Sequence, residues 1–399
     1  MKTLEELKVI RDSMEGEVAL RTHGNASSKY ERHVLVCGGT GCVAGGALQI
    51  RDRLKELLEK DNIPVEVELA DEPHGDVVGL KTSGCHGFCE MGPLLRIEPQ
   101  GWLYIKVKID DCEEIVEKTI KGDECIERLS YKQNGVTYQK QEDIPFYKKQ
   151  TRLVLEHCGH INATSIKEYI AIGGYTALEK CLWDMTADEI IDEVIASNLR
   201  GRGGGGFPMG KKWKSCQRQK DPVKYIVCNG DEGDPGAFMD RSVLEGDPHV
   251  VLEAMAIAGY CIGASQGYIY VRAEYPIAVQ RLEIAIKQAH ELGLLGDNIF
   301  GTGFSFDIGL RLGAGAFVCG EETALMTSIE GNRGEPRPRP PFPAVKGLFE
   351  RPTILNNVET WANIPRIILN GAEWFASMGT EKSKGTKVFA LGGKIRNTG

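Results

Sequence analysis

The sequence predicts an α/β protein in which a small mixed unit precedes a larger, doubly wound parallel sheet. Short strands and two helices fill the first 125 residues, whereas strands and helices alternate regularly after residue 186. Such alternation is typical of a mostly parallel sheet with helices on its faces. The 399 residues, 42% of them hydrophobic, suffice for two or three cores. We expect units at 1–125, 151–372 and 373–399, with a polar linker at 126–150.

The first unit has the element order of a thioredoxin-like fold. Strand-like alternation and a hairpin turn around residues 99–101 are interleaved with amphipathic helices. The predicted strands cover 33–37, 65–70, 94–98 and 102–107, and the predicted helices cover 47–60 and 111–120.

The second unit opens with a helix that is marked at both ends. Thr186 and Glu189 have the spacing of a capping box, and Gly201 follows the helix. Ligands of open parallel sheets bind beyond the carboxyl ends of the strands, so the loops after Cys228 and Leu312 are the candidate site. The predicted helices cover 186–198, 250–262, 277–292 and 322–329, the predicted strands cover 223–228, 268–272 and 304–310, and a strand at 387–392 opens the third unit.

Composition argues against several classes of function. A net charge of −8 without a basic stripe disfavours a nucleic-acid partner. The longest mostly apolar stretch, 250–264, contains Glu253 and is too short to span a membrane. The charged N-terminus has no apolar core of the secretory type. We therefore expect a cytoplasmic protein whose twelve cysteines do not form disulfides.

Four cysteines are candidate metal ligands. Cys37 and Cys42 lie on one glycine-rich loop, and Cys85 and Cys89 lie on another. Thiolates from two loops can enclose a two-iron cluster with two sulfurs per iron, and nearby glycines free backbone N–H groups to face the sulfurs. Zinc is the alternative, although structural zinc sites usually have tight C-x2-C pairs. Four independent buried thiols are the third interpretation.

A glycine-rich loop at 201–206 satisfies G-x-G-x-x-G but lies in the wrong context for a Rossmann fingerprint. That fingerprint follows a strand, whereas here a helix precedes the glycines. A flexible loop is one interpretation. The longer run LRGRGGGGFPMGKKW at 199–213 is more specific, because a loop without side chains can lie flat against a cofactor. Phe207 can stack on a ring and Lys212 can pair with a phosphate.

These segments resemble known redox proteins. The four cysteines, with GCHGFCEMGP at 84–93, resemble the thioredoxin-like [2Fe–2S] ferredoxin domain beside the NADH site of respiratory complex I. The glycine run resembles the signature of the flavin- and NADH-binding subunit of complex I, NAD-linked hydrogenases and formate dehydrogenases. The fused layout is most similar to the NADH-oxidising beta subunit of bifurcating [FeFe] hydrogenases. Three further segments agree: CNGDEGDPGAFMDR at 228–241, GAGAFVCGEETAL at 313–325 and PPFPAVKGLFERPTILNNVET at 340–360.

The resemblance assigns a role to residues of each segment. Taken locally, the acidic loop after Cys228 is also typical of a solvated turn, and acids in a first helical turn are favoured by the helix dipole. The family more often has Glu at Asp234 and Tyr at Phe317, and an aromatic residue after the Lys-Trp pair is absent here. The implied FMN contacts are Gly201, Gly203, Lys212, Asn229, Asp231, Phe317, Gly320, Glu321, Asn356 and Asn357, and the implied NADH contacts are Phe207, Glu232, Asp234, Glu322 and Phe342.

The implied activity is hydride transfer from NADH to FMN, followed by single-electron transfer to iron–sulfur clusters. No catalytic acid–base residue is expected; Glu232 and Glu322 position the nucleotide. Together with Asp234, they predict a preference for NADH over NADPH. Because the family uses the glycine loop for flat stacking, Arg202 and Lys211 are expected to face solvent or a flavin phosphate. Relatives carry a β-grasp-like domain, which we expect to begin at 373–399, and then a [4Fe–4S] domain that this sequence does not contain.

The resemblance also implies partners within a larger complex. We expect a cytoplasmic hydrogenase, including an electron-bifurcating one, with a catalytic subunit, a small [2Fe–2S] subunit and ferredoxin as partners. An NAD-linked formate dehydrogenase or a complex I-like enzyme is the alternative. A ferredoxin-type carrier alone, or a scaffold without cofactors, are the remaining classes.

Overall fold

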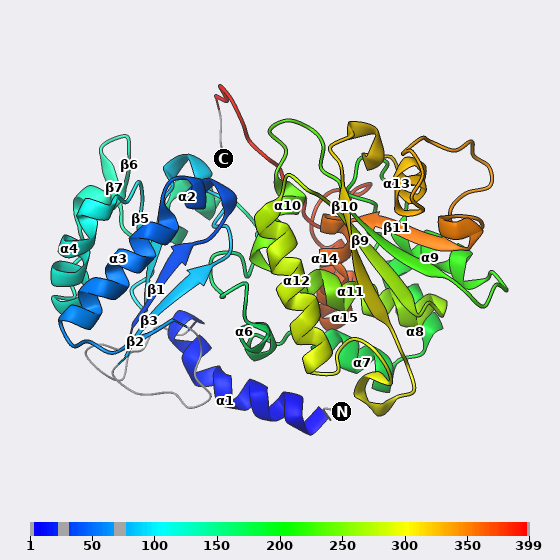
Figure 1. Cartoon of the computed structure of the whole chain (residues 1–399), viewed down its shortest axis with the longest axis horizontal. Helices are drawn as coiled ribbons and strands as arrows, with labels where there is room; N and C mark the ends of the chain where they lie inside the picture. Colours follow the sequence, from blue (N-terminus) through cyan, green and yellow to red (C-terminus); the bar gives the residue numbers. More distant parts are fainter. Residues whose placement is uncertain (1–3, 23–31, 68–76, 397–399) are drawn as a thin grey trace. The chain divides into compact units, whose positions relative to one another are not determined.

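A computed structural model describes residues 4–22, 32–67 and 77–396. The chain divides into two compact units, which are described separately below (Figure 1). The smaller unit comprises mainly residues 8–172 together with 245–247, and the larger unit comprises mainly 173–244 and 248–392. Among the described helices, none is both long enough and apolar enough to cross a membrane.

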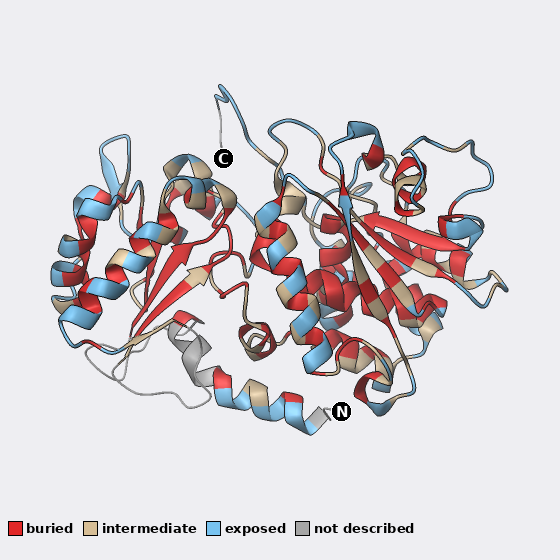
Figure 2. Cartoon of the chain, viewed as in Figure 1, coloured by how far each residue is buried: buried red, intermediate tan, exposed pale blue. Residues whose placement is uncertain are grey.

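The smaller unit contains a five-stranded mixed sheet in the order β2-β3-β1-β4-β5. The central strand β1 pairs in parallel with β3 and antiparallel with β4. Every residue of β1 is buried, as expected for a strand that is covered on both faces (Figure 2). The strands are β1 Arg32–Cys37, β2 Val65–Glu66, β3 Val78–Ser83, β4 Leu95–Glu98 and β5 Trp102–Tyr104, and the main helices are α1 Leu4–Thr22, α2 Thr40–Ala44, α3 Ala47–Lys60, α4 Cys112–Glu114 with a π-helical continuation at Ile115–Lys121, and α6 Ile166–Ala171.

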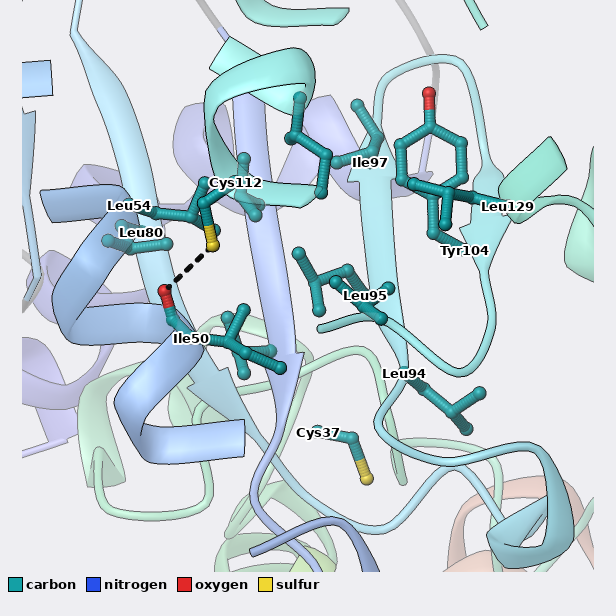
Figure 3. Packing of buried hydrophobic residues seen from close by; sticks show 14 of the residues in the cluster. Cys37, Ile50, Leu54, Leu80, Leu94, Leu95, Ile97, Tyr104, Cys112 and Leu129 are labelled. Atoms are coloured by element: carbon teal, nitrogen blue, oxygen red, sulfur yellow. Dashed lines mark hydrogen bonds between the residues drawn. The ribbon is translucent and has the colours of Figure 1, made fainter. Parts of the chain in front are cut away.

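The core of the smaller unit forms between this sheet and α3. Ile50, Leu54 and Leu58 recur at helical spacing on α3 and are buried. Figure 3 shows Leu54 near Cys112, whose thiol donates to the carbonyl oxygen of Ile50 at 3.8 Å. The amphipathic pattern therefore predicts both the bounds and the buried face of α3 correctly.

Residues 126–150 are not a linker, contrary to the prediction. Ile126, Leu129, Ile144 and Tyr147 are buried in the core of the smaller unit. Polar, exposed residues separate these anchors, so no helical or strand period is visible in the sequence. The segment contains a two-stranded ribbon and a short helix, β6 Tyr131–Gln133, β7 Val136–Tyr138 and α5 Pro145–Lys148.

The larger unit contains a four-stranded, wholly parallel sheet in the order β10-β9-β8-β11 (Figure 1). Buried residues of α13, among them Leu325 and Met326, pack with Val227 on one face. On the other face, Met255 of α11 lies against Gly267. The strands are β8 Tyr225–Gly230, β9 Gln266–Arg272, β10 Asp307–Gly313 and β11 Thr353–Asn357, and the helices are α7 Thr176–Asp184, α8 Ala187–Ala196, α9 Met209–Gln217, α10 Met239–Gly246, α11 Pro248–Ile262, α12 Pro276–Glu291, α13 Glu322–Ile329, α14 Val358–Ala362, α15 Ile364–Asn370 and α16 Ala372–Ala376.

Strand β3 and the segment 387–392 differ from the prediction, and one predicted strand is only partly described. Strand β3 was not predicted, because Gly79 and the buried Lys81, paired with Glu66 at 3.6 Å, interrupt its apolar pattern. Residues 68–70 of the predicted strand 65–70 lie outside the described residues. The predicted strand 387–392 is absent from the described chain; the Val388 N–H donates to the Glu359 carboxylate at 2.9 Å instead of to a neighbouring strand.

Candidate functional site

The candidate site of the larger unit lies where its parallel strands end. Strands β8 and β11 are neighbours, and their register places Asn357 opposite Asn229 and Asn356 opposite Cys228. These residues come from two separate sequence segments. The structure therefore brings Asn229 and the pair Asn356 and Asn357 to the carboxyl edge of the sheet, where ligands of such folds bind.

Asn229 and Gly320 connect two of the predicted segments. The Asn229 amide donates to the carbonyl oxygen of Gly320 at 2.9 Å, and its side-chain oxygen accepts from the Asp231 N–H at 3.0 Å. A Cβ atom on Gly320 would approach the Asp231 carbonyl oxygen to 3.3 Å. The loop after β8 thus packs tightly against the start of the α13 region, and glycine permits the approach.

Two buried polar atoms at this edge have no hydrogen-bond partner among the described residues. They are Oδ2 of Asp231 and Nδ2 of Asn356, which belong to two of the predicted FMN contacts. Burial raises the pKa of Asp231 to about 6. Buried polar groups are nearly always hydrogen-bonded, so an unmatched acceptor and an unmatched donor at one sheet edge fit a polar ligand.

The glycine loop between α8 and α9 is held by its backbone. The Gly201 N–H donates to the Phe207 carbonyl oxygen at 2.9 Å, and the Arg202 N–H donates to Thr360 Oγ1 at 2.8 Å. A Cβ atom on Gly203 would lie 3.2 Å from the Asn357 Cβ, whereas a Cβ atom on Gly205 would meet nothing within 4 Å. One part of the loop therefore contacts the β11 end while another presents open backbone, as a flat ring requires.

Arg202 does not face solvent or a flavin phosphate, contrary to the expectation. Its guanidinium is buried and donates to the carbonyl oxygens of Lys384 and Thr386, the latter at 3.1 Å. The side chain thus holds the segment that follows α16. Lys211, by contrast, is exposed.

Lys212 lies between two of the predicted segments. Its Nζ donates to the Leu355 carbonyl oxygen at 2.6 Å and lies 3.4 Å from Oε2 of Glu322. On the other side, Arg339 donates to Oε1 of Glu322 at 2.6 Å. The charge of Glu322 is therefore offset by two cations. Arg339 was missed in the sequence, although a basic residue directly before PPF at 340–342 is a visible signal.

The remaining predicted acidic residues differ in exposure and partners. Glu321 caps α13, since its carboxylate accepts from the N–H groups of Thr323 and Ala324 at 2.8 and 3.0 Å. Glu232 is buried and accepts from the N–H groups of Met239, Asp240 and Arg241 at the start of α10; burial raises its pKa. Asp234 is exposed.

Three predicted aromatic contacts are exposed to an unusual degree. Phe207, Phe317 and Phe342 have exposed fractions of 58%, 70% and 60%. Such rings are normally buried, so their exposure suits stacking against a planar ligand. A Cβ atom on Gly233 would lie 2.9 Å from the Phe317 ring, which places this ring over the acidic loop.

The four predicted cysteine ligands converge in the smaller unit. Cys37 ends β1, Cys42 lies in α2, and Cys85 and Cys89 follow β3. The Cys85 and Cys89 sulfurs are 3.8 Å apart. Hydrogen bonds from Cys37 and Cys89 hold the pKa of the Cys85 thiol well below its usual value, so the two loops meet through their sulfurs.

Glycines allow this close approach of the cysteine loops. A Cβ atom on Gly39 would lie 2.8 Å from the Cys85 Cβ, and one on Gly92 would lie 2.7 Å from the Cys42 sulfur. The Gly87 N–H donates to the Cys85 sulfur at 3.4 Å. Within the described residues, no three His, Cys, Asp or Glu side chains surround a single metal-ion position. A two-iron cluster is held by pairs of thiolates, and backbone N–H groups donate to its sulfurs. The thiol contacts and the Gly87 N–H fit this arrangement.

Residues 194–366 match the family model described as the Nuo51 FMN-binding domain. The predicted resemblance is confirmed. The NADP-reducing hydrogenase subunit HndC of Solidesulfovibrio fructosivorans is 63% identical over 252 residues, which cover 63% of this chain and 51% of that protein. The chain spans about half the length of the curated relatives it matches.

Solved structures also resemble the chain. The NAD+-reducing [NiFe]-hydrogenase in its H2-reduced state matches with a TM-score of 0.51 and 26% identity, over 96% of this chain and 62% of that chain. A thioredoxin-like [2Fe–2S] ferredoxin from Aquifex aeolicus is 30% identical over 26% of this chain and 97% of its own, with a TM-score of 0.21. The likeness to the hydrogenase structure and the parallel sheet of the larger unit confirm the predicted α/β fold class.

Proposed function

We propose that this chain binds FMN and NADH and moves a hydride between them, as the NADH-oxidising part of a multisubunit hydrogenase. The observation that carries the proposal is the pair of unmatched buried atoms, Oδ2 of Asp231 and Nδ2 of Asn356. Leaving a buried polar atom unmatched costs about 1–3 kcal/mol. A cofactor that offers both a donor and an acceptor at this sheet edge is therefore favoured.

The residues of the chain would bind and orient rather than transfer protons. When bound, FMN accepts a hydride and releases electrons singly. The open backbone around Gly205 leaves room for a flat ring, and Asn229 and Asn357 fix the loops beneath it. Phe207 and Phe342 are free to stack on the nucleotide. We assign no general acid or base.

We further propose that Cys37, Cys42, Cys85 and Cys89 hold a [2Fe–2S] cluster. The glycine-permitted packing of the two cysteine loops against each other supports this proposal, as does the 3.8 Å distance between the Cys85 and Cys89 sulfurs. The ferredoxin-type unit then extends from the first strand to residue 172, because residues 126–150 belong to its core. The start of a β-grasp-like domain at 373–399 remains a prediction.

NADPH is a second candidate nucleotide. The relative at 63% identity is named as an NADP-reducing hydrogenase subunit. In this chain Arg339 and Lys212 offset the charge of Glu322, and a cavity of about 600 Å³ beside α13 is lined by Arg337 and Lys346 among others. We favour NADH, because Glu322 already engages Arg339 and a 2′-phosphate would have to displace it.

The proposed function extends to the cellular location and the partner subunits of the chain. None of the twelve cysteines forms a disulfide in the described part of the chain, which fits a reducing cytoplasm. A hydrogenase catalytic subunit, a small [2Fe–2S] subunit and ferredoxin are the proposed partners, and a [4Fe–4S] domain and electron bifurcation belong to the complete assembly. A formate dehydrogenase or complex I-like enzyme is the alternative, and isolation of the chain with its partner subunits distinguishes them.

The proposal is tested by the cofactors of the purified protein. We expect heat to release FMN, and iron and acid-labile sulfide to remain with the cysteine loops. Release of FAD, covalent retention of the flavin, or absence of both cofactors after anaerobic reconstitution would contradict it. A cluster without flavin would instead support a ferredoxin-type carrier.

A further inference from the structure

The second cysteine loop is held by residues 141–152, a stretch that the sequence divides between the predicted linker at 126–150 and the start of the second unit. His86 lies between the two cysteines of this loop and is fully buried. Its ring contacts Ser83 Oγ at 2.9 Å and Gln141 Oε1 at 3.2 Å. Phe88 stacks on Phe146 with ring centroids 4.6 Å apart. The loop is thus anchored on both sides of Gly87.

The carbonyl oxygen of His86 accepts two hydrogen bonds from this segment. Tyr147 donates through its hydroxyl at 3.1 Å, and Arg152 donates through Nη1 at 2.9 Å. Arg152 Nη1 also lies 3.7 Å from the position that a Cβ atom on Gly87 would occupy. The guanidinium therefore borders the turn that carries Cys85 and Cys89.

Arg152 differs from other buried or half-buried arginines of the unit in its partners. Its acceptors are carbonyl oxygens, those of His86, Leu155 and Cys158, and no carboxylate among the described residues forms an ion pair with it. Arg21 and Arg96, by contrast, pair with Glu168 and Glu98. A half-buried cation without a counter-charge is costly unless a negative group lies nearby.

We propose that Arg152 positions the Cys85–Cys89 turn and raises the reduction potential of the cluster bound there. This inference rests on the proposed [2Fe–2S] cluster. A two-iron cluster with four thiolate ligands carries a net negative charge, and one-electron reduction adds another. A fixed positive charge beside it stabilises the reduced form more than the oxidised form, and burial weakens the screening by water.

The test is a redox titration of the full chain, followed by the EPR signal of the reduced cluster. Arg152→Gln and Arg152→Met remove the charge, and Met retains an apolar contact with the Tyr147 ring, over which Arg152 lies. Arg152→Lys keeps the charge. Tyr147→Phe removes a hydrogen bond to the same carbonyl oxygen without changing charge. Arg128→Gln removes an exposed arginine that pairs with Asp111 and Glu114, and is the matched control.

We expect a more negative midpoint potential in both neutral variants, and unshifted potentials in Arg152→Lys and Arg128→Gln. Tyr147→Phe should shift it less than Arg152→Gln. An unshifted potential in the neutral variants would overturn the inference, and an equal shift in Tyr147→Phe would overturn the role of charge.

Loss of the cluster is also an informative outcome. If both neutral variants lose it while Arg152→Lys retains it, the positive charge is required and the inference stands. If Arg152→Lys also loses the cluster, a positive charge at this position is not sufficient to retain it, and the role of charge is overturned. If the unmodified chain holds no iron and acid-labile sulfide, it is the proposed cluster that fails rather than the role of Arg152.

Discussion

Lys212 on α9 lies 3.4 Å from the carboxylate of Glu322 at the start of α13, although 110 residues separate them in the chain. Arg339 contacts the other oxygen of the same carboxylate at 2.6 Å. Glu322 therefore links three sequence segments, and any nucleotide phosphate placed beside it must compete for these cations.

This arrangement predicts the choice of nucleotide. A 2′-phosphate brings roughly −1.5 to −2 charges to the site. We expect NADH to exceed NADPH at least about tenfold in kcat/KM, or roughly 1.4 kcal/mol. Glu322→Gln should reduce this difference, mainly by raising kcat/KM for NADPH, because the substitution removes the repulsion of the 2′-phosphate and releases Arg339. Dye reduction at low ionic strength measures both rates, since salt screens the difference.

Arg339→Gln is the control, because it removes one of the two cations beside Glu322. Arg339→Gln should widen the gap, because it leaves the Glu322 charge less balanced. Equal rates with both nucleotides in the unmodified protein would contradict the charge argument, even with the flavin assignment intact.

The unmatched Oδ2 of Asp231 predicts a direct contribution to flavin affinity. Asp231→Ala should raise the Kd for FMN about 5- to 150-fold, because one buried hydrogen bond worth about 1–3 kcal/mol is lost. Quenching of flavin fluorescence on titration of the flavin-free protein measures this. Asp221→Ala, which removes a carboxylate paired with Arg351 elsewhere on the unit, should bind FMN normally. An unchanged Kd in Asp231→Ala would remove Asp231 from the site.

The convergence of four thiols predicts a defined loss of iron. Cys37→Ala or Cys85→Ala should abolish the [2Fe–2S] centre, because each removes one of the four sulfurs. Cys112→Ala should retain it, since that thiol instead donates to the Ile50 carbonyl oxygen in the core. Iron and acid-labile sulfide analysis, with EPR, measures the outcome. Stoichiometric zinc without sulfide would contradict the assignment.

Burial of Glu359 predicts a pH-dependent stability. Desolvation raises the pKa of this carboxyl from 4.5 to about 7. Between these values the folded state holds a proton that the unfolded state has lost, so the free energy of unfolding should fall as pH rises from about 4.5 to 7. The contribution is on the order of 3 kcal/mol.

A matched variant isolates this titration. Glu359→Gln keeps an oxygen that can accept from the Val388 N–H but cannot ionise. Its free energy of unfolding, from urea denaturation of the flavin-free protein, should depend less steeply on pH in this window. The same slope in both proteins would show that Glu359 does not titrate there.

Sequence patterns predicted the elements whose chemistry is local. The capping box of Thr186 and Glu189 is present in the structure, and α3 and α13 begin and end where their periodicity indicates. The carboxyl-edge position of Asn229 follows from the alternation of strands and helices. These features depend on neighbours within a few residues, so they are readable from one sequence.

Other features depend on partners far along the chain. Residues 126–150 have the sequence of a linker because the residues that bury their side chains in the core, Ile126, Leu129 and Ile144, do not recur at helical or strand spacing. The contacts of Lys212 with the Leu355 carbonyl oxygen and with Glu322 arise only when separate segments of the chain meet. The predicted strand 387–392 failed for the same reason, since a strand exists only with a pairing partner.

The central claim is that this chain holds a flavin that NADH can reduce. Anaerobic titration of the FMN-loaded full chain with NADH, followed by absorption spectroscopy, tests it most directly. We predict bleaching of the bound flavin as NADH is added, and a weakened response in Asp231→Ala at the same flavin concentration. An FMN-loaded chain whose flavin spectrum stays unchanged with either NADH or NADPH would contradict the claim.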